Sequence, residues 1–388
     1  MPLFKDSAEE RDFRTALRRF VARELTPHYE EWDKARNIPR EAWKKMGKQG
    51  YICPWLPEGY GGVDADFKYS VIIVQELVRG DCLIGIPNHQ DVAVPYIYYF
   101  GSDDMKEKLL PGCASGDLIA CIAMTEPDCG SDLAAVRTKA VRDGDYYIIN
   151  GQKTFITNAI NADIIIVACK IEDPHASEGS PKKKPISLIV VEGDSLKYVR
   201  RRQLEKMGRH ALDTGELFFE DCKVPVGNLL GKEGKGFSYM MHELNRERLL
   251  VCIMMQAYAE ECLKEALNYA KVREAFGKPI GNFQHIAFEL AQMATDVEIG
   301  NTFFYTCVEE FVQGEDILRK VSMLKAWLGE MVNRVAYKAV QVHGGYGYMA
   351  EYRVCRLYQD VRVMSIFAGS TEIMNLIVAR QLGLNPIF

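Results

Sequence analysis

The sequence predicts an α+β multidomain protein with an N-terminal helical domain (1–118), a middle antiparallel β domain (119–232) and a C-terminal helical bundle (233–388). Three observations favour this order. Apolar residues recur every three or four positions in both outer parts, which is typical of helices that bury one face. Short runs rich in β-branched and aromatic residues fill the middle part. Turn signals separate those runs.

In the N-terminal domain, helical spacing covers residues 7–24 and 68–80. Proline and glycine gather between them, from Pro54 to Gly62, and mark a break. The domain is therefore expected to consist of helices joined by irregular segments.

The middle domain contains the runs LIACIAM, YYIIN, ADIIIVACK, ISLIVVE and ELFFED. Asp143-Gly144 and Asn150-Gly151 are tight-hairpin signals, because glycine accepts a positive φ at no steric cost. These runs predict an antiparallel barrel or sandwich. A charged segment, Glu178–Lys184, is expected to be a solvated loop.

The C-terminal domain begins with residues 238–276, which contain neither glycine nor proline. Further helical patterns cover 284–312 and 316–342. Long helices with short connections predict a bundle of about four.

Composition excludes several classes of protein. The formal net charge of −5 argues against nucleic acid as the main partner, since a nucleic-acid-binding face usually shows as a basic excess. No apolar run is long enough to span a bilayer, so stable membrane insertion is not expected. The eleven cysteines include no C-x-x-C pair, and they are expected to be reduced and mostly buried. The charged N-terminus resembles neither a signal nor a transit peptide, which favours the cytoplasm, or the mitochondrial matrix if a leader has been removed.

Several common catalytic motifs are absent. There is no phosphate-binding P-loop and no G-x-S-x-G elbow. His242-Glu243 lacks a second histidine at helical spacing, so no zinc site and no other metal site is expected. Gly345-x-Gly347-x-x-Ala350 formally matches a dinucleotide fingerprint, but it follows a helical pattern instead of a strand. Any dinucleotide is therefore held in another way.

Six blocks, in order, resemble the acyl-CoA dehydrogenase family. They are CIAMTEPDCGSDLAAVRTKA (121–140), GQKTFITNA (151–159), KMGRHALDTGELFFEDCKVP (206–225), REAFGKPIGNFQ (273–284), QVHGGYGY (341–348) and IFAGSTEIM (366–374). They extend from about residue 120 to the C-terminus, and the helical first third fits the N-terminal domain of that family. The resemblance implies FAD as cofactor, acyl-CoA as substrate and dehydrogenation between its α and β carbons.

The resemblance also implies where FAD binds. In this family the first block lies along the flavin, where Thr125 would bond the ring, and Phe155 and Thr157 would lie beside the ring and near N5. Arg273 would hold the pyrophosphate of a cofactor bound by the neighbouring subunit, which implies a homo-oligomer, a dimer or a dimer of dimers. The positions assigned to FAD are Ile122, Ala123, Met124, Thr125, Gly130, Ser131, Phe155, Ile156, Thr157, Arg273, Phe276, Gln284, Gln341, Val342, His343, Gly344, Gly345, Ser370, Thr371 and Glu372.

The catalytic base departs from the majority pattern of the family. Most members place a glutamate just before the glycine of the last block, where this chain has Ala368. The long-chain and isovaleryl types place it on a bundle helix, at the position of Glu247. Glu247 is therefore the expected base, with a pKa raised toward neutrality by apolar surroundings. The backbone N–H of Ala368 is implied to bond the thioester carbonyl. The positions assigned to the substrate are Ser131, Asn245, Arg248, Ala368 and Gly369.

The acyl group and the electron acceptor stay open. The blocks look closest to the long-chain type, but His89, Arg209 and His210 are polar residues that would suit a succinyl-type substrate, and Ser238 stands where relatives carry tyrosine. A cyclic or aromatic thioester is a further alternative. The resemblance implies electron-transferring flavoprotein as acceptor. An acyl-CoA oxidase, or a non-catalytic protein that binds CoA and flavin, are the competing interpretations.

Overall fold

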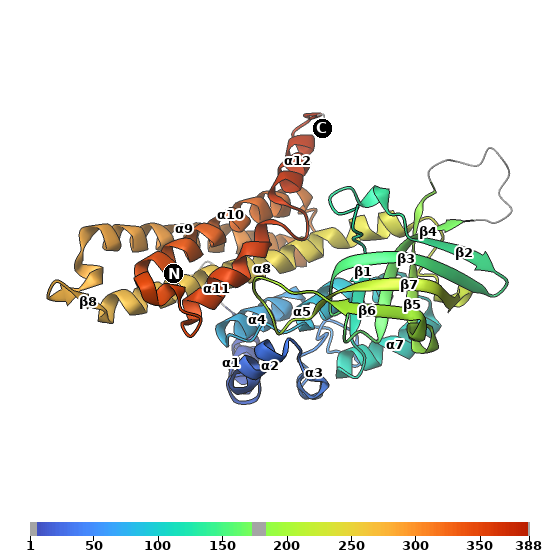
Figure 1. Cartoon of the computed structure of the whole chain (residues 1–388), viewed down its shortest axis with the longest axis horizontal. Helices are drawn as coiled ribbons and strands as arrows, with labels where there is room; N and C mark the ends of the chain where they lie inside the picture. The colour runs from blue at the N-terminus through green and yellow to red at the C-terminus, as the bar shows by residue number, and fades with distance from the viewer. Residues whose placement is uncertain (1–5, 173–183, 387–388) are drawn as a thin grey trace.

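The computed structural model describes residues 6–172 and 184–386 and contains the predicted helical, β and helical parts in that order (Figure 1). The β domain lies at one end of the molecule, and three long helices extend from it to the other end. The N-terminal helices lie along one side of both. Of the predicted charged loop Glu178–Lys184, all but Lys184 lies outside the described residues.

The N-terminal part is helical, as predicted. Its first helix begins at a capping box, in which Ser7 accepts from the Glu10 backbone and the Glu10 side chain accepts from the Ser7 backbone. Its helices are α1 (Ala8–Glu24), α2 (Thr26–Ala35), α3 (Arg40–Lys48), α4 (Phe67–Arg79), α5 (Ile86–Asn88), a π-helical turn (His89–Ala93), α6 (Val94–Phe100) and α7 (Asp103–Ser115).

The middle part is a curled seven-stranded sheet with the order β1-β4-β2-β3-β7-β6, and β5 pairs with β4. Its strands are β1 (Ala120–Ala123), β2 (Lys139–Asp143), β3 (Tyr146–Thr157), β4 (Ile164–Glu172), β5 (Ile186–Glu192), β6 (Val199–Gln203) and β7 (Thr214–Pro225). The β domain is confirmed, with one difference from a purely antiparallel sheet. Strand β4 runs parallel to β1 and β2, because the antiparallel strand β3 returns the chain to the end at which β2 starts before β4 begins.

One of the two predicted hairpins forms. At Asp143-Gly144 the chain turns between β2 and β3, and Gly144 has a φ of 57°. The hairpin predicted at Asn150-Gly151 is wrong, because β3 continues through it with a bulge opposite β7. Gly151 is needed there for another reason: a Cβ at this position would lie 2.8 Å from the Cα of Thr138.

The C-terminal part is built on α8 (Gly236–Val272), α9 (Gln284–Val312) and α10 (Leu318–His343), which match the three predicted helices. A hairpin of β8 (Glu274–Ala275) and β9 (Lys278–Pro279) joins α8 to α9 at the end far from the sheet (Figure 1). The short helices α11 (Arg353–Val361) and α12 (Thr371–Gln381) pack on α10. At 1.5 Å per residue, the 37 residues of α8 extend for about 55 Å.

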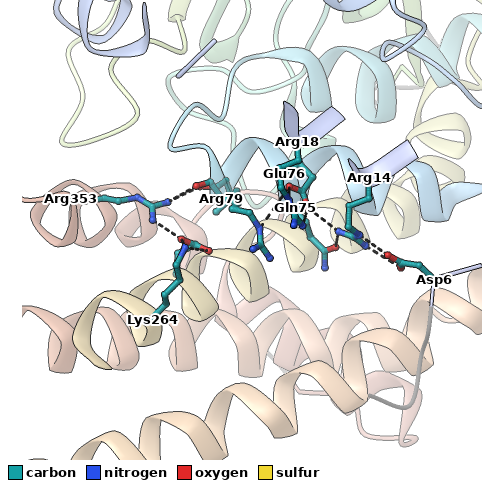
Figure 2. Close-up of polar contacts among 10 residues, drawn as sticks. Asp6, Arg14, Arg18, Gln75, Glu76, Arg79, Lys264 and Arg353 are labelled. Carbon is teal, nitrogen blue, oxygen red and sulfur yellow. Dashed lines mark hydrogen bonds and ion pairs between the residues drawn. The ribbon is translucent and has the colours of Figure 1, made fainter. Parts of the chain in front are cut away.

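Ion pairs and hydrogen bonds link the N-terminal helices to one another and to the bundle (Figure 2). Glu76 of α4 is buried and accepts from Arg14 and Arg18 of α1. Arg353 of α11 pairs with Glu261 of α8 and donates to the Val78 carbonyl of α4. Buried pairs of this kind fix the relative position of helices far apart in sequence.

Two hydrophobic cores hold the parts together. The larger core is continuous between the N-terminal helices, one face of the sheet and the bundle, and the smaller one fills the other face of the sheet. All eleven cysteines are free thiols and ten of them are buried, as the sequence predicts. No helix within the described ranges is long and apolar enough to cross a bilayer.

Candidate active site

Glu247 lies on α8 and is 5% exposed. The hydroxyl of Tyr96, itself fully buried on α6, donates to Glu247 Oε1 over 2.9 Å. Burial raises the pKa of Glu247 from an ordinary value of 4.5 to about 7, a change that the Tyr96 bond and Arg248 oppose and Glu243 increases. The predicted rise of this pKa toward neutrality is confirmed. A carboxylate with this pKa, in a buried site, suits a general base.

The residues beside Glu247 on α8 take different roles. Arg246 is held within the chain, because its Nη2 pairs with buried Asp91 over 2.7 Å and its guanidinium stacks on the ring of Trp55, although its Nε has no hydrogen-bond partner among the described residues. Arg248 Nε and Asn245 Oδ1 are buried and have no hydrogen-bond partner among the described residues. A buried polar atom without a partner is costly, so these two atoms mark where a ligand would bind. They are two of the positions that the sequence assigns to the substrate.

The loop that carries Ala368 is held against α10 by a buried lysine. Ala368 and Gly369 both have left-handed backbone, with φ of 52° and 89°. Lys325 of α10 is fully buried and donates to the Gly369 carbonyl. Burial, with a smaller effect of Arg248, lowers the pKa of Lys325 to about 8. The sequence analysis missed Lys325, although a lysine in the apolar pattern Val321–Trp327 was a signal.

The remaining predicted positions in this loop stand at the start of α12. Ser370 caps that helix by accepting from the Ile373 backbone. Thr371 donates to Glu330 of α10, and Glu372 lies on the first turn.

The flavin block is anchored to β3 by buried polar contacts. Thr125 and Thr154 exchange backbone and side-chain bonds, with Thr125 Oγ1 donating to the Thr154 carbonyl. Lys153 is fully buried, pairs with Glu126 over 2.8 Å and donates to the Met124 carbonyl. These contacts fix the conformation of the block, and the sequence did not single out Lys153 or Glu126.

An aromatic side chain next to this block faces out of the chain. Phe155 is 72% exposed and has a φ of 59°. Thr157 is half-buried on the same strand, and Ile156 points the opposite way into the smaller core, so that only its backbone is available. Gly130 and Ser131 are exposed. A large exposed ring in a sparsely populated backbone conformation indicates a contact made by something outside the chain.

The second group of predicted cofactor positions forms a separate cleft of about 520 Å³. Arg273 and the glycines Gly344 and Gly345 line it, together with His343, whose ring stacks on Tyr269 at 4.3 Å. No atom lies within 4 Å of a Cβ added at either glycine, so the backbone is open to a ligand. Arginine and accessible backbone fit a pyrophosphate. Val342 also lines the cleft, Gln341 and Gln284 are exposed, and Phe276 at the tip of the β8–β9 hairpin is 95% exposed.

One chain does not bring the two groups of cofactor positions together. The hairpin that carries Phe276 lies at one end of the molecule and the sheet that carries Phe155 at the other (Figure 1). Each end presents residues that fit one part of a dinucleotide.

The polar residues considered for a carboxylated substrate lie elsewhere. His89 Nε2 faces the Cys113 carbonyl and Nδ1 accepts from the Ala120 backbone, so both ring nitrogens are engaged, and burial lowers the pKa of His89 to about 4. Arg209 lies against Asp360 and Tyr258, eleven residues along α8 from Glu247. His210 is half-buried and Ser238 is exposed. No group of histidine, cysteine and carboxylate side chains in the described ranges could hold a metal ion.

Comparison with known proteins covers almost the whole chain. Residues 7–117, 121–222 and 234–383 match the family models described as the N-terminal, middle and C-terminal domains of acyl-CoA dehydrogenase. The chain is 40% identical over 377 residues to the mitochondrial long-chain specific acyl-CoA dehydrogenase of Mus musculus, covering 97% of this chain and 87% of the relative. It is 32% identical over 384 residues to the mitochondrial isovaleryl-CoA dehydrogenase of Oryza sativa subsp. japonica, with 98% and 92% covered. A crystal structure of acyl-CoA dehydrogenase from Geobacillus kaustophilus superposes with a TM-score of 0.94 at 50% identity, covering 99% of this chain and all of the other.

Proposed function

The chain belongs to the acyl-CoA dehydrogenase family, and from that premise we propose that Glu247 removes the α proton of an acyl-CoA thioester, which is converted to the trans-2-enoyl-CoA. The observation that carries this proposal is the environment of Glu247. It is the buried carboxylate with a pKa of about 7, bonded by Tyr96, while Ala368 has no side chain that can take a proton.

The surrounding residues of this chain bind and orient the substrate. Asn245 Oδ1 and Arg248 Nε, which lack partners within the described chain, would bond the CoA arm. The Ala368 N–H would bond the thioester carbonyl, and a backbone donor does not depend on the missing side chain. Lys325 keeps that loop in place through the Gly369 carbonyl. A polarised carbonyl acidifies the α C–H, which brings it within reach of a carboxylate base.

FAD is the cofactor that the family uses and that the residues fit. Thr125, Phe155 and Thr157 would hold the flavin, and Arg273 with Gly344 and Gly345 would hold the rest of the dinucleotide. When bound, FAD supplies the acceptor for the β hydride. Because the two groups lie at opposite ends of one chain, we propose that a second copy completes each site, in a dimer or a dimer of dimers.

We propose an uncharged acyl chain, of the long-chain or branched type. The long-chain specific and isovaleryl relatives support this choice, as do the internal hydrogen bonds of His89, which engage both ring nitrogens and leave neither for a carboxylated substrate. Electron-transferring flavoprotein is the proposed acceptor, as in the family resemblance. Reoxidation of the reduced protein by air, with release of peroxide, would support an oxidase instead. Eleven free thiols fit the reducing cytoplasm or matrix.

The test uses the purified holoenzyme without oxygen, mixed with straight, branched, cyclic and carboxylated acyl-CoAs while the flavin absorbance is followed. The wild type should bleach with one class. Glu247→Gln should slow bleaching by at least about 100-fold, since a positioned base contributes about 10²–10⁴-fold. Glu298→Gln, an exposed carboxylate on α9, is the matched control and should match the wild type.

A second variant distinguishes the base from its surroundings. Adding Ala368→Glu to Glu247→Gln should restore part of the bleaching, because the family places its base at either position. An unchanged bleaching rate in Glu247→Gln would contradict the assignment of Glu247 as the base. A protein that holds FAD but is bleached by no acyl-CoA would support the non-catalytic interpretation.

A further inference from the structure

Glu247 has to lose the proton that it takes before it can act again. Its side chain is almost completely buried, and Tyr96 covers Oε1. A bound acyl-CoA would cover the substrate side. The proton therefore needs a path through the protein.

A second carboxylate lies one helical turn before Glu247. Glu243 is also buried on α8, and residues four apart on a helix have Cβ atoms about 5–6 Å apart. This spacing puts both side chains on one face of α8, and the charge of Glu243 raises the pKa of both Tyr96 and Glu247. Two acidic side chains at this spacing repel each other and destabilise a helix, which makes their burial together unusual for a purely structural pair.

Glu243 in turn contacts the surface. Its Oε1 lies 2.7 Å from His242 Nδ1, and the His242 side chain is 62% exposed. The His242 ring packs against the rings of Tyr99 and Phe100, each with centroids 5.6 Å apart. His242 and Glu243 together form a polar link from water to the helical turn that precedes Glu247.

The other charged groups nearby are occupied. Arg246, which also faces Glu243, pairs with Asp91, and Arg248 lies on the Lys325 side of the helix. His242 and Glu243 have no further ligand with which to hold a metal in the described ranges. The pair is thus free to exchange protons.

We propose that Glu243 and His242 form the exit path for the proton that Glu247 takes from the substrate, an inference that rests on the role of Glu247 as base. Protonated Glu247 gives its proton to the Glu243 carboxylate, either directly or through the Tyr96 hydroxyl. Glu243 passes it to His242 Nδ1. The imidazolium releases a proton to water, and its exposed ring regains the starting tautomer through solvent. One proton leaves, no electron moves, and Glu247 is again anionic.

The test compares proton exchange with flavin chemistry in the same holoenzyme. Each variant is incubated in D2O without oxygen with the acyl-CoA that bleaches it, and deuterium at the α carbon of recovered acyl-CoA is measured by mass spectrometry. The exchange rate reports exit and re-entry of the proton, whereas the bleaching rate reports its removal from substrate. Glu243→Gln should lower exchange at least tenfold more than it lowers bleaching.

His242→Ala provides a surface variant that is expected to fold and to respond to chemical rescue. Its exchange should fall, and added imidazole should restore it in proportion to concentration, while imidazole leaves the wild-type rate unchanged. His285→Ala, an exposed histidine on α9, is the control and should exchange as the wild type does. Glu247→Gln should lose exchange and bleaching together.

The outcomes separate this inference from the proposed function. Equal loss of exchange and bleaching in Glu243→Gln, or no rescue of His242→Ala by imidazole, would overturn the exit path and leave the role of Glu247 intact. Exchange that persists in Glu247→Gln would overturn the proposed base itself.

Discussion

Tyr96→Phe should move the pH dependence of flavin bleaching without removing the base. The Tyr96 hydroxyl donates to Glu247 over 2.9 Å and stabilises the anionic form, so it lowers the pKa of Glu247 against the larger effect of burial. A hydrogen bond to a charged group contributes about 1.5–3 kcal/mol, and one pKa unit corresponds to about 1.4 kcal/mol. Loss of the hydroxyl should therefore raise this pKa by about one to two units from its value of about 7.

The sign of the effect follows from the role of the base. Glu247 must be anionic to take a proton, so the rate falls as the pH drops below its pKa. At pH 7 the anionic fraction should fall from about half in the wild type to about a tenth or less in Tyr96→Phe. Near pH 9.5 the two rates should converge, which a general loss of structure would not produce.

The assay is the initial rate of bleaching at low acyl-CoA concentration between pH 5.5 and 9.5, which reports the pKa of the free enzyme. Tyr98→Phe, a half-buried neighbour on α6 that packs against Trp55, is the matched control and should leave the acidic limb in place. An acidic limb that stays fixed in Tyr96→Phe, in a protein that retains its flavin, would refute the reasoning.

Three further predictions concern stability and cofactor binding. Lys153→Met should leave the buried negative charge of Glu126 without its ion-pair partner. The free energy of unfolding should fall by about 3–5 kcal/mol in thermal unfolding, and FAD should be released. Adding Glu126→Gln should recover part of the lost stability. Glu247→Gln should make the melting temperature less sensitive to pH. Because the pKa of Glu247 is raised in the folded protein, its favourable contribution to the free energy of unfolding is complete below pH 4.5 and is lost as the pH rises through about 7, by up to about 3 kcal/mol. Glutamine does not titrate, so the variant should not show this loss. If the variant and the wild type have the same pH dependence, Glu247 is not buried as described. Arg273→Ala should reduce the ratio of FAD to protein after gel filtration, whereas Lys271→Ala should not. An unchanged ratio in both variants would contradict the proposal that the cleft beside Arg273 binds FAD.

Periodic patterns in the sequence were sufficient for the fold but not for the details of the sheet. Residues 238–276 have one helical period and no helix breaker, so α8 could be predicted almost to its ends. Asn150-Gly151 has the composition of a turn, yet the glycine serves close packing against Thr138 inside a strand. A local pattern cannot distinguish the two uses, because the partner that requires the glycine, Thr138, lies thirteen residues before Gly151 and comes close only when the sheet forms.

The same limit applies to the site. Glu247 could be proposed as the base from the sequence, because the family offers two positions for the base and this chain has alanine at one of them, Ala368. Tyr96 could not, since 151 residues separate it from Glu247 and its own surroundings read as an ordinary apolar helix. Lys325 was likewise hidden, because its partner is a backbone carbonyl, and any residue type supplies one.

The proposed placement of the base on α8 would assign to two residues two requirements that otherwise fall on one. In the majority pattern a single position must supply a backbone N–H for the thioester and a carboxylate for the α proton. Here Ala368 keeps the left-handed backbone, fixed through its neighbour by Lys325, and no side chain there has to be accommodated. The carboxylate sits instead on a long helix, where α6 orients it through Tyr96 and the preceding turn supplies Glu243.

Because a helix surface offers neighbours four residues apart, this position for the base brings with it an adjacent carboxylate and the proposed route to water, which a loop position lacks. The pKa of the base and the orientation of the thioester can therefore be changed by different residues, which is why Tyr96→Phe should alter the pH dependence and leave binding of the acyl-CoA in place.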